Sequence, residues 1–291
     1  MEISNTKMEL VGQRVLHGGL ILLSIVFLYP IALTFMVSIS SERSVTLYGY
    51  QIIPKEFSME AYRVVFATPI VVRAYGVTIL TTAVGTVLSI IICGSAGYAI
   101  SLQRVKYRNI ISMFFYIPMI FNAGLVPWYL VCTQILHLRN SFAALIVPAL
   151  VSSFNLFLMR NYFKTIPPSI TESADIDGAN PLKTFFSIII PLSTPIIATS
   201  TLFISLGYWN SWTEALWFID NPNLVPLQYM LFKIRSQMEI IQMSGSIGSS
   251  QVPSQTFQVA TLFVTIGPII LVYPFVQKYF VKGIMVGAVK G

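Results

Sequence analysis

A short run of aromatic and polar residues carries the clearest binding chemistry in the sequence. Trp209, Asn210, Trp212 and Glu214 lie close together, just after Gly207, which would loosen a helix. Aromatic faces with polar groups at their rims are suited to binding sugars. Glu214 is an acid in an otherwise apolar stretch, and such residues in membrane proteins usually face a cavity or a partner. The alternative is that Glu214 lies at a membrane interface beside a belt of Trp residues.

Two asparagines inside apolar runs, Asn122 and Asn155, are further candidates for the same binding path, although such residues more often join helices. The remaining reactive side chains form no catalytic pattern. The two histidines are isolated, and both cysteines lie inside apolar runs, which disfavours a zinc site. The sequence contains neither a Gly-x-x-x-x-Gly-Lys-Ser/Thr phosphate loop nor a His-Glu-x-x-His motif. It therefore predicts no enzyme activity, no metal site and no cofactor in this chain.

The composition sets the class of protein that must position these residues. Of the 291 residues, 55% are hydrophobic and only 10% are charged, whereas soluble domains carry about 25% charged residues. The charges are too few to cover a water-soluble globule, so the sequence predicts a polytopic membrane protein. The net charge of +7 comes from Lys and Arg in short loops between apolar runs. Membrane topology explains that excess better than binding of nucleic acid does.

The apolar runs predict an all-α fold with six transmembrane helices in one domain, residues 1–291. A helix needs about 20 mostly apolar residues to cross a hydrocarbon core of about 30 Å. Six stretches qualify, at residues 16–39, 74–102, 110–133, 142–159, 185–219 and 257–276. An even number of spans places both termini on one side of the membrane.

The distribution of Lys and Arg predicts which side that is. Eleven of these residues lie on the side of the termini and seven on the other side. The bias is clearest in the short loop from Arg104 to Arg108. Because short loops rich in Lys and Arg stay in the cytoplasm, both termini are predicted to be cytoplasmic.

The cytoplasmic loop at residues 161–184 is predicted to contain two short helices joined at a glycine. Ser169 and Glu172 match a capping box, and the helix that they begin would end at Gly178. Asn180 would then cap a second helix whose first residue is Pro181. Helices this short are marginal in water and hold their shape only when they pack against something.

One surface of the first short helix could insert into a partner. Ile170, Ala174 and Ile176 would form an apolar ridge flanked by acids. The alternative is an ordinary polar loop whose acids are solvated.

The same loop carries a family resemblance. The run from Glu172 to Ala179 (ESADIDGA), followed by Phe185, Ile188 and Pro191-Leu192, resembles the EAA loop of ATP-binding-cassette importer permeases, in its carbohydrate-uptake form. Ser173 stands where that family usually has alanine. Further segments, such as Pro127 to Leu130 and Trp209-Asn210, are similar to the second permease of maltose-type sugar importers.

The resemblance implies a type I importer permease fold and a set of partners. These are a homologous second permease, two ATP-binding subunits or domains that bind ATP and Mg, an extracytoplasmic solute-binding protein, a sugar and the lipid bilayer. No nucleic acid is implied. Glu172 would face a basic group on the ATPase, Gly178 would form the bend, and Pro191 would start the span on which the loop pushes. The ATPase-coupling residues so implied are Glu172, Ser173, Ala174, Asp177, Gly178, Ala179 and Pro191.

The function expected from this resemblance is import of sugars, oligosaccharides in particular, across the cytoplasmic membrane of a bacterium or archaeon. An ion-coupled secondary transporter is the alternative. That class would need more spans in matched repeats and charges at the membrane midplane, which six spans with one acid do not supply.

Overall fold

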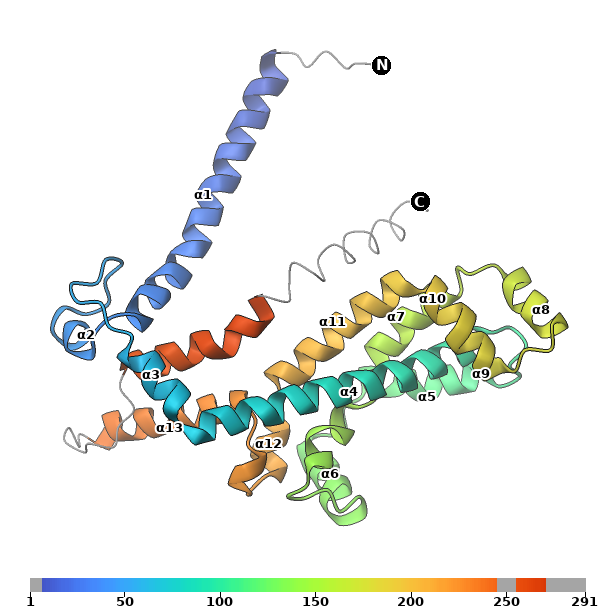
Figure 1. Ribbon diagram of the computed structural model, residues 1–291. Helices are drawn as coiled ribbons and strands as arrows, with labels where there is room; N and C mark the ends of the chain where they lie inside the picture. Colours follow the sequence, from blue (N-terminus) through green and yellow to red (C-terminus); the bar gives the residue numbers. More distant parts are fainter. Residues whose placement is uncertain (1–6, 245–254, 271–291) are drawn as a thin grey trace. The chain divides into compact units, whose positions relative to one another are not determined.

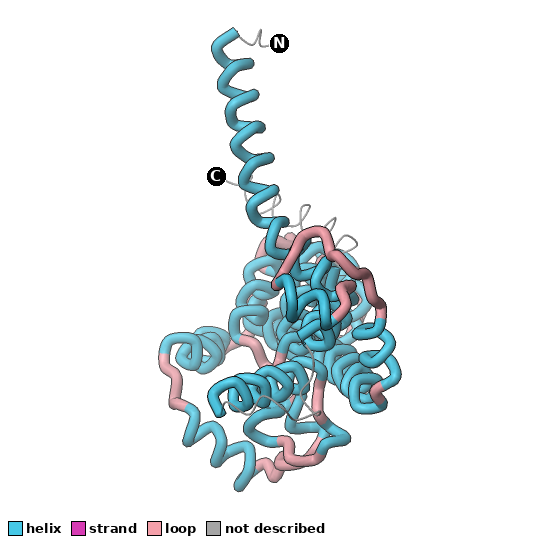
Figure 2. The backbone as a smooth tube through the Cα atoms, turned by 90° about the vertical axis from the view of Figure 1, so that its left-hand side faces the viewer, coloured by secondary structure: helices cyan, strands magenta, loops and turns pink. Residues whose placement is uncertain are grey.

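The computed structural model describes residues 7–244 and 255–270, and within these ranges the protein is helical (Figure 2). One isolated β-bridge in the described residues joins Ser40 and Phe57. The chain divides into two compact units. Among the described residues, one unit comprises 7–68, 234–244 and 255–265, and the other comprises 69–233 and 266–270.

The N-terminal stretch of the first unit contains one long helix and two short ones. These are α1 (Lys7–Ser38), α2 (Glu42–Tyr48) and α3 (Glu60–Ala67). The Ser41 side chain caps α2 by accepting the Ser44 N–H at 3.1 Å, and the Glu42 carboxylate accepts the backbone N–H groups of Gln255 and Thr256, each at 3.0 Å. Only 6% of the apolar stretch Gly12–Ser38 is buried. The apolar surface of α1 is therefore free to face lipid or another helix.

The second unit is built around α4 (Pro69–Ser101), which lies side by side with α7 (Ser153–Phe163) and α11 (Thr194–Asn210) (Figure 1). Its buried core joins these three helices through side chains such as Leu156, Met159, Phe185 and Tyr208. Gly97 lets the helices approach closely, because a β-carbon there would lie 3.0 Å from the Leu156 carbonyl oxygen. Small residues at a helix interface are characteristic of packing between membrane helices.

Shorter elements complete the second unit. Two helices, α5 (Arg108–Ile120) and α6 (Leu125–Leu130), are followed by a π-helical turn at Val131–Ile135 and 3₁₀ turns at Phe142–Leu145 and Val147–Ala149. After α7 come α8 (Pro168–Ile176), α9 (Pro181–Thr184), a π-helical turn at Phe185–Ile189 and α10 (Ile190–Leu192). The elements after α11 are α12 (Thr213–Phe218), a 3₁₀ turn at Pro222–Leu224, α13 (Leu227–Ser244), which continues into the first unit, and a helix at Gln255–Ile270.

Length and composition qualify two described helices as straight membrane spans, Gly12–Ser38 and Pro69–Ser101. Three bent pairs could each add one span. Arg108–Ile120 with Leu125–Ile135 bends by 119°, Phe142–Ala149 with Ser153–Phe163 by 50°, and Pro181–Leu192 with Thr194–Asn210 by 89°. The sixth expected stretch, 257–276, lies within the described residues only as far as Ile270. The count of six and the side of the termini therefore stay predictions.

Three expected stretches are interrupted in the structure. The stretch 142–159 consists of 3₁₀ turns as far as Ala149 and of α7 from Ser153 onward. The stretch 110–133 is interrupted after Phe121, where the Asn122 side chain accepts the Gly124 N–H at 2.9 Å and Gly124 adopts φ +87°. The stretch 185–219 is not one helix, because α11 ends at Asn210 and Ser211 is extended. Hydropathy measures how apolar a stretch is but not where its backbone bends.

Candidate functional site

The first short helix of the loop begins two residues earlier than predicted. Its N-cap is Pro167, its first residue is Pro168, and no side chain caps it. Proline suits the first helical position, because its ring fixes φ and it has no N–H to leave unpaired. Ser169 consequently falls inside the first turn, so the capping box predicted with Glu172 does not form.

The bend and the second helix of the loop form as predicted. Gly178 has φ +72°, in the left-handed region that favours glycine. The Gly178 N–H donates to the Asp175 carbonyl at 3.1 Å, and the Ala179 N–H donates to the Ala174 carbonyl at 2.9 Å. The Asn180 side chain then accepts the Leu182 N–H at 3.1 Å, with Pro181 as the first residue of α9. The loop therefore has a bend fixed by its own backbone.

The predicted apolar ridge does not form on one surface. Ala174 is 5% exposed and packs inward, whereas Ile176 is 86% exposed. The helix makes only about two and a half turns, and residues two positions apart point to different sides. Glu172, Ser173 and Asp177 are exposed. The surface that α8 offers to a partner is therefore acidic and polar, with Ile176 as its exposed apolar residue.

An ion pair ties α8 to the connection between α4 and α5. The Arg104 guanidinium contacts the Asp175 carboxylate, and both side chains are partly exposed. Arg104 was identified in the sequence only as a topology signal. Pro191, the last of the expected coupling residues, is exposed in α10, just before the 89° bend that leads into α11.

The expected sugar-path residues lie at the end of α11 and the start of α12. Trp209 lines an apolar cavity of about 200 Å³ beside α4 and the helix Gln255–Ile270. The Asn210 side chain accepts from Gln228 at 3.2 Å, and Trp212 stacks on Phe232 with ring centroids 4.6 Å apart. Of this group only Trp209 lines the cavity, and Trp212 already has an aromatic partner.

Glu214 lies in the first turn of α12 and accepts hydrogen bonds from the Ser211 hydroxyl and, at 3.0 Å, from the Thr213 hydroxyl. A carboxylate there also benefits from the helix dipole. Asn122 and Asn155 belong to other elements. Asn122 is exposed between α5 and α6, and Asn155 is buried in the first turn of α7, where its amide donates to the Ser152 hydroxyl at 2.9 Å. Asn155 therefore has a local structural partner.

Tyr208 is a residue of this region that sequence reasoning missed. Its ring is buried between α4 and α11, and its hydroxyl donates to the Ile146 carbonyl at 3.1 Å and lies 3.2 Å from the Ser89 hydroxyl. It anchors α11 directly before Trp209. No local motif marks it, because its partners are distant in the sequence.

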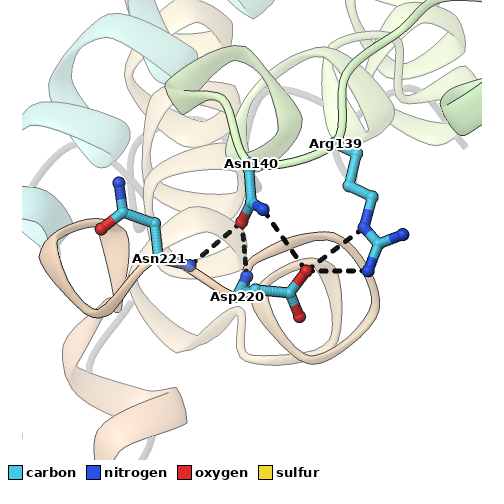
Figure 3. A network of polar contacts seen from close by, with 4 residues as sticks. All are labelled: Arg139, Asn140, Asp220 and Asn221. Carbon is cyan, nitrogen blue, oxygen red and sulfur yellow. Dashed lines mark hydrogen bonds and ion pairs between the residues drawn. The ribbon is translucent and has the colours of Figure 1, made fainter.

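A polar network joins the segment before Phe142 to the segment after α12 (Figure 3). The Arg139 Nε and Nη2 atoms donate to Asp220 Oδ2 at 3.2 and 2.9 Å. The Asn140 side-chain oxygen accepts the N–H groups of Asp220 and Asn221 at 2.6 and 3.0 Å. The hydrogen bond and charge of Asp220 raise the pKa of Arg139 above its usual value. This network joins the segment before Phe142 to the chain directly after α12, the helix that carries Glu214.

Comparison with known proteins places these features in context. The family described as binding-protein-dependent transport system inner membrane component matches residues 95–286. The polygalacturonan/rhamnogalacturonan transport system permease protein YtcP of Bacillus subtilis is 34% identical over 278 residues, which are 95% of this chain and 97% of YtcP. Protein LplC of the same organism is 36% identical over 266 residues, covering 91% of this chain and 88% of LplC.

A solved structure is also similar over nearly the whole chain. It is described as a bacterial ABC transporter involved in the import of the acidic polysaccharide alginate. The similarity has a TM-score of 0.85 at 31% sequence identity and covers 94% of this chain and 98% of the other.

Proposed function

The chain belongs to the family of binding-protein-dependent transport system inner membrane components, and on that premise we propose that it is the permease subunit of an ATP-driven oligosaccharide importer. The observation that carries the proposal is α8, a short helix with an exposed acidic surface and a bend preset at Gly178. The chain forms half of the translocation path. Energy comes from two ATP-binding subunits that bind ATP and Mg, since this sequence has no phosphate loop.

The proposed arrangement has six spans and cytoplasmic termini in the cytoplasmic membrane of a bacterium or an archaeon. A second, homologous permease completes the path, and an extracytoplasmic binding protein delivers the sugar. Glu172 faces a basic group on the ATPase, and the bend at Gly178 holds it in place. Movement of the loop passes through α9 and α10 to Pro191 and switches the cavity between its inward-facing and outward-facing states.

Uronate-containing oligosaccharides are the proposed substrate class. The support is that YtcP is named for polygalacturonan and rhamnogalacturonan transport and the similar solved transporter for alginate import. Trp209, Asn210, Trp212 and Glu214 are the proposed path residues, with Asn122 and Asn155 as secondary ones. Their aromatic rings would bind the faces of the sugar, and their polar groups the hydroxyls.

Purification and reconstitution of the native complex test this function. We expect the tagged chain to bring down a second permease and an ATPase, and the complex in liposomes to import an oligogalacturonide only with ATP and the binding protein. Glu172→Lys should lose the ATPase and uptake, whereas Glu60→Lys, the same charge change on exposed α3, should keep both. Uptake by the isolated chain on an ion gradient would instead establish the secondary-transporter alternative.

A further inference from the structure

A cavity of about 670 Å³ lies where α8 meets the ends of α4, α5 and α7. Its walls carry four basic side chains, Arg104, Arg108, Arg160 and Lys164, and two acids, Glu172 and Asp175. Asp175 is paired with Arg104. The lining therefore carries a net charge of 4 − 2 = +2, concentrated on residues from α5 and α7.

The basic side chains repel one another in the absence of an anion. Arg160 and Lys164 are four residues apart at the end of α7, a spacing at which like charges on a helix are neighbours. Burial, and then the charges of Arg160 and Arg108, lower the pKa of Lys164. Arg160 is held in place by a donated hydrogen bond to the Ile100 carbonyl at 3.4 Å and lies over the Phe157 ring at 5.6 Å. A bound anion would offset this repulsion.

The first turn of α8 adds to the positive potential. Pro168 and Thr171 line the cavity, and no side chain caps this helix end. The dipole of a helix N-terminus favours anions, phosphate groups in particular. Arginine side chains also match the geometry of phosphate oxygens. The basic lining is thus suited to a phosphate group.

The position of the cavity indicates where that phosphate comes from. It lies at the ends of apolar helices, and α5 begins at its wall with Arg108. None of the residues of α5 is buried, and Ile110, Phe114 and Ile117 are among its exposed side chains. An acyl chain could therefore lie along α5 while its headgroup enters the cavity. Basic pockets between helices at the membrane surface are known to suit phospholipid headgroups.

We propose that this cavity, lined by Arg108, Arg160 and Lys164, binds the phosphate of an anionic phospholipid and holds it beside α8. The lipid joins the membrane surface to the helix that carries Glu172. Lipid binding here requires only that the chain is embedded in a membrane. The proposed orientation, with cytoplasmic termini, decides which leaflet supplies the lipid.

Lipid binding without substrate or ATP tests this proposal separately from transport. The native complex, or the full chain alone, is placed in nanodiscs of phosphatidylcholine with a small fraction of labelled phosphatidylglycerol, and retained lipid is measured by native mass spectrometry and fluorescence. Arg108→Gln with Lys164→Gln should weaken phosphatidylglycerol binding about 30-fold, since each basic residue contributes about 1 kcal/mol. Arg108→Lys with Lys164→Arg keeps the charges and should keep binding, which controls for misfolding.

Lys106→Gln with Lys183→Gln is the matched control, because both lysines are exposed and neither lines the cavity. It makes the same charge change and should leave binding unchanged. Equal binding by wild type and the Arg108/Lys164 glutamine variant would overturn the proposal. Equal loss of binding in the control variant, or displacement of the lipid by inorganic phosphate alone, would also overturn it. If the glutamine variant loses the ATPase in phosphatidylcholine, the proposal is likewise overturned and the cavity is assigned to protein docking.

Discussion

The ring of Tyr208 occupies the space in which a β-carbon on Gly85 would lie. Such a β-carbon would come within 2.5 Å of the Tyr208 Cζ atom. The close approach of α4 and α11 at this point lets the Tyr208 hydroxyl reach the Ile146 carbonyl. The absence of a side chain at Gly85 thus positions the helix that ends at Trp209 and Asn210.

Gly85→Ala should destabilise the protein by about 1 to 3 kcal/mol, because the added methyl group overpacks a filled interface and displaces Tyr208. Thermal unfolding in detergent measures the change. Gly76→Ala, in the same helix, is the control, since a β-carbon there meets nothing within 4 Å. That variant should be neutral or slightly stabilising. Equal melting temperatures for the two variants would contradict this reading of the interface.

Asn140→Gly should lower stability by about 1 to 2 kcal/mol while leaving the backbone at its observed φ of +56° unstrained. The substitution removes the acceptor for the N–H groups of Asp220 and Asn221. His137→Gly is the matched control at φ +51°, where relief of backbone strain should make the change neutral or favourable. Thermal unfolding of both variants decides the matter, and a neutral Asn140→Gly would mean that the network adds no stability.

Gly178→Ala should impair the loop at residues 161–184 through its backbone alone. A β-carbon there meets no neighbour, but φ +72° costs an L-residue about 1 to 2 kcal/mol. Gly178→Asn should be milder, because asparagine tolerates this conformation better. The measurement is ATP-driven uptake in reconstituted complexes of matched expression. Identical uptake by the alanine and asparagine variants would show that the bend does not depend on its left-handed backbone.

Reversing one charge of the Arg104–Asp175 pair should reduce uptake more than it reduces stability. The two side chains are 48% and 37% exposed, so the pair adds only about 0.2 to 1 kcal/mol. Arg104→Asp should nevertheless misorient α8 by repelling Asp175. Combining it with Asp175→Arg restores opposite charges and should recover most of the uptake per ATP hydrolysed. A double variant as inactive as Arg104→Asp alone would exclude a role for the pairing itself.

The lowered pKa of Lys164 predicts that the stability of the protein depends on pH. Its pKa in the folded chain lies below the ordinary value of 10.5, so the folded chain holds this proton less tightly than the unfolded chain does. Stability therefore rises as pH rises through the lowered pKa, and the gain is complete above 10.5. In detergent without anionic lipid, Lys164→Gln should melt higher than wild type at neutral pH, and the difference should shrink toward alkaline pH. Lys183→Gln, at an exposed site, is the control. A difference that stays constant with pH would argue against charge repulsion at Lys164.

Local features of the loop at residues 161–184 could be predicted because the interacting groups are neighbours in the sequence. Asn180 caps a helix through the N–H two residues later, and Gly178 supplies a backbone conformation of its own. The prediction for Ser169 was wrong for an equally local reason, since Pro168 already provides a favourable first helical residue. Ala174 was placed on an outer surface because a helical pattern does not reveal which side faces the rest of the chain.

Contacts between distant residues could not be predicted from one sequence. Arg104 with Asp175, Gly85 with Tyr208, and Arg139 with Asp220 are each brought together by the packing of separate elements. The apolar length of each span could be predicted from the sequence, but the bends could not. A hydropathy pattern does not register a single residue such as Ser193, where the chain turns from α10 into α11.

The right-angle turn at Ser193 has a mechanical consequence. Pro181–Leu192 and Thr194–Asn210 meet at 89°, so a displacement of the first segment along its own axis is transverse to the second. Axial movement of one segment would therefore become lateral movement of the other. An axial displacement of the first segment would tilt α11, and the far end of that helix, with Trp209 and Asn210, would move furthest.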